Sequence, residues 1–318
     1  MKMEKFTDCS KQRLVVSSYN KDIPSLCFME IDFQNKTYQM LDEKKLNAPS
    51  FVIQSDKYLF TYSKNPIQLV SYKVENNQMI KVDTMFLPGT TLTHLAYSKK
   101  HQKLFAASYL DGAYLSVDVK DGCFSNLAYF KQEETMDSKC HCVTLSEDEN
   151  KVYITNIAQD KIYVYDFHLN YLETFFLPKG VGPRHMVIVD DYFYVITEYS
   201  NEVLVLNPEG ILIERITTIN GYPNKTNAAT LLYHDGYLYA SNRGLETIAV
   251  FKVNNHLLTY LKMIPTFGNH SRHMIFDQTK EYIISFNKQS NQISIINIAK
   301  EQEELSIPFE QVSSGCII

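Results

Sequence analysis

Short runs of alternating hydrophobic and polar residues recur along the whole chain and are separated by turn residues. Alternation with a period of two over short runs is typical of β-strands, and no long helical periodicity is visible. One set of similar runs recurs at intervals of roughly 45 residues, a spacing expected of a structural repeat. The set consists of RLVVSSY (13–19), YLFTYSK (58–64), LFAASYL (104–110), VYITNIA (152–158), FYVITEY (193–199), LYASNRG (238–244) and YIISFNK (282–288). The pattern therefore predicts seven copies of one β unit.

Each of these runs has further strands in phase with it. A second apolar strand follows every run, another precedes every run from the second unit onward, and weaker polar strands complete the units. Four short antiparallel strands repeated at this period are typical of the blade of a β-propeller. We therefore expect an all-β, seven-bladed β-propeller with four-stranded antiparallel blades. Because no linker or break in composition divides the chain, residues 1–318 are expected to form a single domain.

The two ends of the chain predict how the ring closes. The first unit has no evident inner strand before residue 13, whereas residues 312–318 follow the seventh unit with no outer strands after them. We expect this C-terminal strand to become the inner strand of the first blade. Closure of the ring removes exposed strand edges, which otherwise template aggregation.

Polar residues recur at two strand ends that should meet at one mouth of the central channel. Four histidines begin inner strands, at what we interpret as one repeat position: His94, His141, His185 and His273. Arg184 and Arg272 precede two of them, while Glu198 and the pair Asn242-Arg243 stand at the ends of the neighbouring strands. We expect five of these side chains, from three consecutive blades, to converge on that mouth: His141, Arg184, His185, Glu198 and Arg243.

Part of this group also has a purely structural explanation. Arg184 and Glu198 lie nearly opposite each other in one hairpin and could form a cross-strand ion pair. Repeated histidines could be spacers inherited by duplication, which is what we expect of His94 and His273. Duplication does not explain one carboxylate and two arginines found only beside each other, so we interpret that group, with His141, as functional.

Composition and charge restrict the partners. The net charge is −5, with 31 basic and 36 acidic residues, so we expect neither a nucleic acid nor an anionic membrane as a partner. No apolar run reaches the length of a membrane span, and residues 1–6 lead into no signal segment. The six cysteines are irregularly spaced and form no disulfide framework. We therefore expect free buried thiols in a cytoplasmic protein.

The stretch Cys140-His141-Cys142 raises the question of a metal site. Successive side chains of an extended strand point to opposite faces, so three adjacent ligands do not readily close on one ion. No distant Cys-x-x-Cys pair completes a zinc site. We expect no metal and no other cofactor.

Three segments carry a resemblance to a known family: GVGPRHMVIVDDYFYVITEYSNEVLVL, LYASNRGLETIAVFKV and SRHMIFDQTKEYIISFNKQSNQISIINI. They resemble the seven-bladed lactonases, which include bacterial 6-phosphogluconolactonases of the propeller type and fungal carboxymuconate cycloisomerases. The chain departs from the family at residues 138–142, where relatives usually carry a proline-rich histidine motif. It also departs at residues 227–230, where relatives often carry an acidic residue.

The resemblance implies active groups at His141, Arg184, Glu198 and Arg243. We add three substrate-binding candidates from the same strand ends: His185, Asn242 and Arg272. The implied reaction is hydrolysis of a small anionic sugar lactone, and 6-phosphogluconolactone is the substrate that we expect. His141 or Glu198 would take a proton from water, and one arginine would stabilise the oxyanion.

The second arginine would hold a phosphate or carboxylate with its planar fork. Two alternatives stay open at this point. A cycloisomerase would use the same groups to move a proton without consuming water. A propeller that serves only as a binding platform is the alternative from a different class, because a fold does not fix a function.

Overall fold

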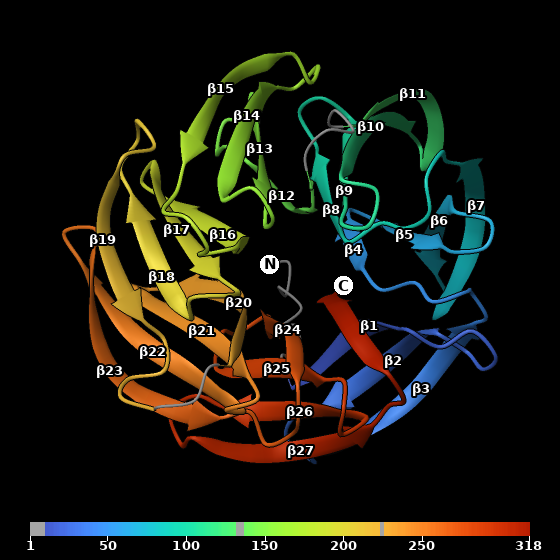
Figure 1. The fold of residues 1–318 in the computed structure, drawn as a ribbon. Helices are drawn as coiled ribbons and strands as arrows, with labels where there is room; N and C mark the ends of the chain where they lie inside the picture. Colours follow the sequence, from blue (N-terminus) through green and yellow to red (C-terminus); the bar gives the residue numbers. More distant parts are fainter. Residues whose placement is uncertain (1–9, 132–136, 223–225) are drawn as a thin grey trace, which may run out of the picture.

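The protein forms a ring of seven β-sheets around a central channel (Figure 1). The structure is a computed structural model that describes residues 10–131, 137–222 and 226–318. Each sheet has four antiparallel strands. The prediction of an all-β, seven-bladed propeller with four-stranded antiparallel blades is therefore confirmed.

In each of the first four blades the strands follow one another from the channel outward. The first consists of β28 (Val312–Ile317), β1 (Lys11–Ser18), β2 (Leu26–Asp32) and β3 (Thr37–Lys44). The second consists of β4 (Val52–Ser55), β5 (Tyr58–Ser63), β6 (Gln68–Glu75) and β7 (Gln78–Phe86). The third consists of β8 (His94–Ser98), β9 (Lys103–Ser108), β10 (Ala113–Lys120) and β11 (Cys123–Lys131). The fourth consists of β12 (Cys140–Leu145), β13 (Lys151–Asn156), β14 (Lys161–Asp166) and β15 (Tyr171–Phe176).

The last three blades have the same order. The fifth consists of β16 (Pro183–Val189), β17 (Tyr192–Thr197), β18 (Glu202–Leu206) and β19 (Leu212–Thr217). The sixth consists of β20 (Asn227–His234), β21 (Tyr237–Arg243), β22 (Thr247–Asn254) and β23 (Leu257–Pro265). The seventh consists of β24 (Ser271–Phe276), β25 (Tyr282–Asn287), β26 (Gln292–Asn297) and β27 (Gln302–Pro308).

The hydrophobic core lies between neighbouring blades, which explains the two kinds of strand pattern. Middle strands such as β25 and β26 are buried on both faces and read as almost continuous apolar runs. The outer strand β19 alternates between half-buried and exposed residues, because one of its faces meets solvent. The blades thus pack face to face and leave the polar strand ends at the rims of the channel.

The C-terminal strand closes the ring as predicted. β28 pairs antiparallel with β1, with Val16 opposite Gly315, and so provides the inner strand of the first blade. A side chain at Gly315 would come within 2.7 Å of the Val15 carbonyl oxygen, so the close approach of the two strands requires glycine. The first blade is therefore built from both ends of the sequence.

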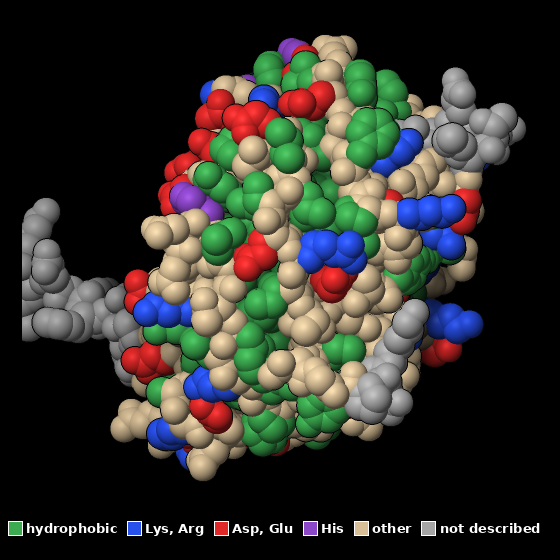
Figure 2. Space-filling view, turned by 60° about the vertical axis from the view of Figure 1, so that its left-hand side comes forward, with side chains coloured by type: hydrophobic (Ala, Val, Ile, Leu, Met, Phe, Trp, Pro, Cys, Tyr) green, Lys and Arg blue, Asp and Glu red, His purple; other side chains and the backbone are tan. Residues whose placement is uncertain are grey.

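Helices and surface charge are the structural features that bear on the expectations about a membrane. Among the described residues, no helix is long and apolar enough to cross a membrane. Residues 1–6, on which the expected absence of a signal segment rests, lie outside the described residues. On the face drawn in Figure 2, basic side chains are scattered among acidic and hydrophobic ones.

Candidate active site

A cavity of about 340 Å³ lies at one mouth of the channel, and all seven blades contribute to its lining. Much of the lining comes from one repeat position, at the end of the second strand of each blade. We call it the strand-end position; around the ring it is occupied by Tyr19, Lys64, Tyr109, Ile157, Glu198, Arg243 and Lys288. All of these residues except Ile157 line the cavity, whereas Ile157 is buried in the core. The propeller therefore presents the same backbone position seven times to one polar space.

The inner strands supply two further positions, which strand pairing aligns around the ring. The first inner position is occupied by Ser313, Ser50, Thr93, His141, Arg184, Ala229 and Arg272. The second inner position, one residue further along, is occupied by Ser314, Phe51, His94, Cys142, His185, Thr230 and His273.

The alignment corrects one interpretation made from the sequence. His141 does not share a repeat position with His94, His185 and His273; Cys142 takes that place in the fourth blade. Val143 pairs with Ile154 just as Met186 pairs with Val195, which fixes the register. The inner strands carry a register shift just before this point, so residue spacing along the chain does not give the alignment. His141 therefore occupies the same position as Arg184 and Arg272.

Glu198 joins the fifth and sixth blades through two buried arginines. Its Oε2 atom lies 3.0 Å from Arg184 Nε and 3.0 Å from Arg243 Nη2. Arg184 Nη1 also donates a hydrogen bond to the carbonyl oxygen of Ala229. The Arg184 Nε contact is close but not aligned as a hydrogen bond, so it is mainly electrostatic. The predicted ion pair within the hairpin thus exists, and it extends to a second arginine.

The fork of Arg243 is already occupied by protein oxygens. Its Nε donates to the carbonyl oxygen of Asn227 at 3.1 Å, and its Nη2 donates to that of Ala228 at 3.2 Å. Apart from Arg184 Nε, which faces Glu198 without a hydrogen bond, the guanidinium nitrogens that have no protein acceptor within the described residues are Nη1 of Arg243 and Nη2 of Arg184. Each guanidinium therefore keeps one nitrogen for a ligand, and Arg243 has no free bidentate edge.

The electrostatic balance keeps Glu198 ionised. Burial would by itself raise the pKa of Glu198, but the charges of Arg184 and Arg243 outweigh burial and hold the pKa below its usual value. Burial, followed by repulsion from Arg243, lowers the pKa of Arg184 to about 9. The carboxylate therefore compensates two guanidinium charges that water does not reach well.

His141 is a buried, neutral imidazole in the cavity wall. Burial, followed by the charge of Arg184, lowers the pKa of His141 well below its usual value. Within the described residues its Nδ1 atom has no hydrogen-bond partner. Its ring lies 6.0 Å from that of Tyr109 and 5.0 Å from that of His185. The Nδ1 atom is itself buried, so any proton exchange with the cavity would use the imidazole through its accessible side.

The substrate-binding candidates occupy different places. Arg272 lines the cavity and lies over the ring of Tyr19 at 5.2 Å. His185 is buried deeper in the channel, where it lines a smaller hollow, and its Nδ1 lies 3.4 Å from Thr230 Oγ1.

Asn242 does not line the cavity. Its side-chain amide accepts a hydrogen bond from Thr218 Oγ1 at 2.6 Å and donates one to the Thr218 carbonyl oxygen at 2.9 Å. The equivalent position carries a small, buried polar residue in every blade: Ser18, Ser63, Ser108, Asn156, Thr197, Asn242 and Asn287. This position favours a packing role for Asn242 over the substrate contact expected from the sequence.

The cavity residues that were missed from the sequence include Tyr19, Lys64 and Lys288. Taken one blade at a time, each is an ordinary residue at the end of a strand. The signal that could have found them is the strand-end position itself, because the seven aligned runs already contain all three residues next to Glu198 and Arg243.

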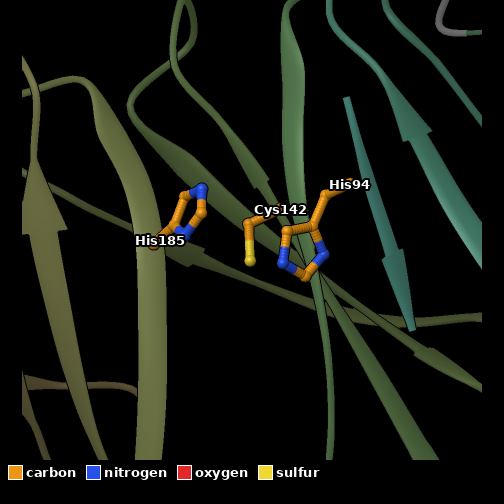
Figure 3. Close-up of side chains that lie close together, drawn as sticks. All are labelled: His94, Cys142 and His185. Atoms are coloured by element: carbon orange, nitrogen blue, oxygen red, sulfur yellow. The ribbon is translucent and has the colours of Figure 1, made fainter. Parts of the chain in front are cut away.

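Three potential metal ligands meet in the channel, although not the three adjacent ones considered from the sequence. His94, Cys142 and His185 come from three neighbouring blades and point toward one another, with their ligand atoms within 4.8 Å (Figure 3). The amide of Val143 donates to His94 Nδ1 at 3.4 Å, which occupies one ligand atom. Burial raises the pKa of Cys142 to about 11, which disfavours the thiolate that a metal requires. These features argue against a bound cation, and the absence of a metal stays a prediction.

The fold and site define a propeller with a polar cavity large enough for a small molecule. The cavity lining contains a histidine and two arginines that are both paired with the same glutamate. The family model described as lactonase, 7-bladed beta-propeller, matches residues 13–315. The chain therefore belongs to the seven-bladed β-propeller lactonase family.

Similar proteins cover nearly the whole chain. A 6-phosphogluconolactonase of Bacillus subtilis is 25% identical over 89% of this chain and 90% of its own length. One of Formosa agariphila is 24% identical over 95% and 97%, respectively. The solved structure of the periplasmic gluconolactonase of Pseudomonas aeruginosa superimposes with a TM-score of 0.88 at 18% identity, covering 97% of this chain and 99% of that one. A Lactobacillus plantarum protein superimposes with a TM-score of 0.87 at 21% identity, with the same coverage. These structures share the fold.

Proposed function

We propose that the protein hydrolyses 6-phosphogluconolactone to 6-phosphogluconate. In this proposal it is a cytoplasmic enzyme of the oxidative pentose phosphate pathway, and its seven blades form a single domain. The observation that carries the proposal is the cavity that brings His141 together with the Arg184–Glu198–Arg243 group. The choice of substrate is supported by relatives named 6-phosphogluconolactonase that match almost the full chain.

In this proposal His141 transfers the proton. Water adds to the lactone carbonyl carbon while the His141 imidazole takes a proton from the water, and a tetrahedral oxyanion forms. The bond from that carbon to the ring oxygen then breaks, the carbonyl re-forms, and the ring oxygen receives the proton from the imidazolium. The low pKa of His141 makes its imidazolium a strong acid toward the ring oxygen and its imidazole a weak base toward water, so the first proton transfer is the more demanding one. The product is an open-chain hydroxy acid.

The two arginines act on the oxyanion. Besides Arg184 Nε, which lies against Glu198, the guanidinium nitrogens without a protein acceptor within the described residues are Arg184 Nη2 and Arg243 Nη1. Glu198 fixes both guanidinium groups before substrate arrives, and donors that are already oriented stabilise developing charge most effectively. Because backbone carbonyl oxygens already occupy the Nε and Nη2 atoms of Arg243, we assign phosphate binding to neither arginine.

The test is hydrolysis of freshly generated 6-phosphogluconolactone above its spontaneous rate. His141→Gln should lower kcat by about a hundredfold or more, the usual contribution of a general base. His101→Gln is the matched control, because His101 stacks on Phe167 outside the cavity. Circular dichroism checks that both variants fold. Wild-type turnover in His141→Gln, or no acceleration by the wild type, would contradict the proposal.

Isotope labelling separates the hydrolase from the isomerase alternative. In water enriched in oxygen-18, hydrolysis places one solvent oxygen in the product carboxylate. An isomerase transfers a proton and leaves the oxygen content unchanged. Turnover without oxygen-18 in the product would therefore overturn the assignment as a hydrolase.

A further inference from the structure

We infer that Lys64, Arg272 and Lys288 form a separate subsite of the cavity that binds the phosphate group of the substrate. The inference rests on the proposed function for the identity of the ligand. The three residues come from the second and seventh blades and surround Tyr19 of the first blade, which lies between them in the ring.

The three cations converge on one aromatic ring. Lys288 Nζ lies 4.7 Å from the centroid of the Tyr19 ring, the guanidinium carbon of Arg272 lies 5.2 Å away, and Lys64 Nζ lies 5.7 Å away. All three side chains are half-buried and line the cavity. An aromatic face stabilises nearby cations only modestly, so their mutual repulsion is not offset by Tyr19 alone.

No carboxylate within the described residues forms an ion pair with these three cations. Glu198, the acidic residue of the cavity lining, is already paired with Arg184 and Arg243. The lining therefore holds an excess of positive charge in a protein whose net charge is −5. An unpaired cluster of this kind is what an anionic ligand would neutralise.

The local potential is positive enough to affect both Tyr19 and Lys64. Burial would raise the pKa of Tyr19, but the charge of Arg272, hydrogen bonds from Ser313 and Ser50, and the charge of Lys288 together hold it below its usual value. Burial, with repulsion from Arg272 and Lys288, lowers the pKa of Lys64. A bound dianion would relieve the repulsion among these groups.

The subsite divides the cavity between two tasks. The arginines on Glu198 belong to the fifth and sixth blades and are occupied by protein oxygens. The unpaired cations belong to the seventh and second blades, and Ser50, Thr91 and Thr93 also line the cavity. A phosphate dianion suits several separate cations, whereas the neutral lactone ring needs only oxyanion donors.

Calorimetric titration of the full chain with 6-phosphogluconate, gluconate and inorganic phosphate tests the subsite at one fixed ionic strength. The wild type should bind 6-phosphogluconate at least about tenfold more tightly than gluconate, and inorganic phosphate should compete. Lys64→Met and Lys288→Met remove one charge each while keeping an unbranched side chain. Each should lower the affinity for 6-phosphogluconate by about tenfold or more, with a smaller loss for gluconate.

Two further variants serve as controls. Lys161→Met removes a half-buried lysine that also lies over an aromatic ring, 5.4 Å from the Phe176 centroid, but outside the cavity. It should keep the preference for the phosphorylated ligand. Lys288→Arg keeps the charge and should retain the preference within a few-fold. Thermal unfolding curves check that each variant folds.

A preference for 6-phosphogluconate that persists in both methionine variants, or a wild type that does not discriminate, would overturn the subsite. Lactone hydrolysis measured on the same preparations tests the proposed function independently of the subsite. If phosphate preference depends on Lys64 and Lys288 but no lactone is hydrolysed, the subsite stands and the proposed function falls. If hydrolysis is observed but the preference for 6-phosphogluconate is unchanged in both methionine variants, the proposed function is supported and the subsite is refuted.

Discussion

Glu198→Gln should lower the stability of the fold as well as its activity. The substitution keeps the shape of the side chain but removes the charge that faces Arg184 and Arg243. The arginine side chains are only 3% and 7% exposed, so water does not take over the role of the carboxylate. Burial already lowers the pKa of Arg184, and loss of the Glu198 charge would lower it further.

The expected size of the effect follows from this burial. Removing one partner of a buried ion pair costs about 3–5 kcal/mol in the free energy of unfolding. The entropy of unfolding near the midpoint scales with chain length and amounts to about 0.7 kcal/mol per degree for this chain. Glu198→Gln should therefore lower Tm by about 4–8 °C.

The fifth blade also contains a matched control. Glu202 is 18% exposed, close to the 19% of Glu198, and lies 2.8 Å from Arg215 Nη2. The difference is the partner, because Arg215 is 44% exposed. An exposed pair contributes about 0–1 kcal/mol, so Glu202→Gln should change Tm by less than about 2 °C.

The effect should also depend on pH in a defined direction. The folded-state pKa of Glu198 is lowered from 4.5, so its stabilisation is complete above that unfolded value and is lost as pH falls through the folded value. Scanning calorimetry should show the full difference between wild type and Glu198→Gln at pH 7 and a shrinking difference below about pH 4.5. Equal Tm changes for Glu198→Gln and Glu202→Gln at pH 7 would refute the reasoning.

Three further predictions concern the site, the thiols and the ring. Arg243→Lys should lower kcat/KM by about a hundredfold, because one ammonium cannot replace the guanidinium contacts; unchanged steady-state kinetics would make those contacts purely structural. Changing Cys140 and Cys142 together to Ala should leave activity within a few-fold, whereas stoichiometric zinc in the purified wild type, measured by elemental analysis, would contradict the thiol assignment. Deleting residues 312–318 should cause aggregation visible by light scattering; a stable monomer would contradict the role of β28.

The fold was predictable because every blade repeats the same information. Period-two alternation and turn residues fixed the strands, and the lack of an inner strand before residue 13 indicated the role of residues 312–318. The position of His141 was not predictable from spacing. The register shift just before it changes which residue faces which partner, and only strand pairing reveals that Cys142 takes the histidine position.

The site was predictable where unlike charges stood close together, as in Arg184 and Glu198. Site residues were missed where their role depends on residues from blades that are distant in the sequence. Lys64 and Lys288 look like ordinary surface lysines until the ring places both beside Tyr19. Asn242 shows the opposite case, because its residue type suggested a ligand contact while its position carries a small, buried polar residue in every blade.

The closure of the ring has a consequence for the order in which the protein is made. β28 leaves the ribosome after every other strand of the ring, yet it belongs to the first blade. Ser313 and Ser314 hold it against the second blade through the Ser50 carbonyl oxygen and the Val52 amide. During synthesis the wall around Tyr19 therefore stays open until the last strand docks. A nascent chain acquires its complete cavity only when this strand docks, so ligand binding would report that the ring has closed.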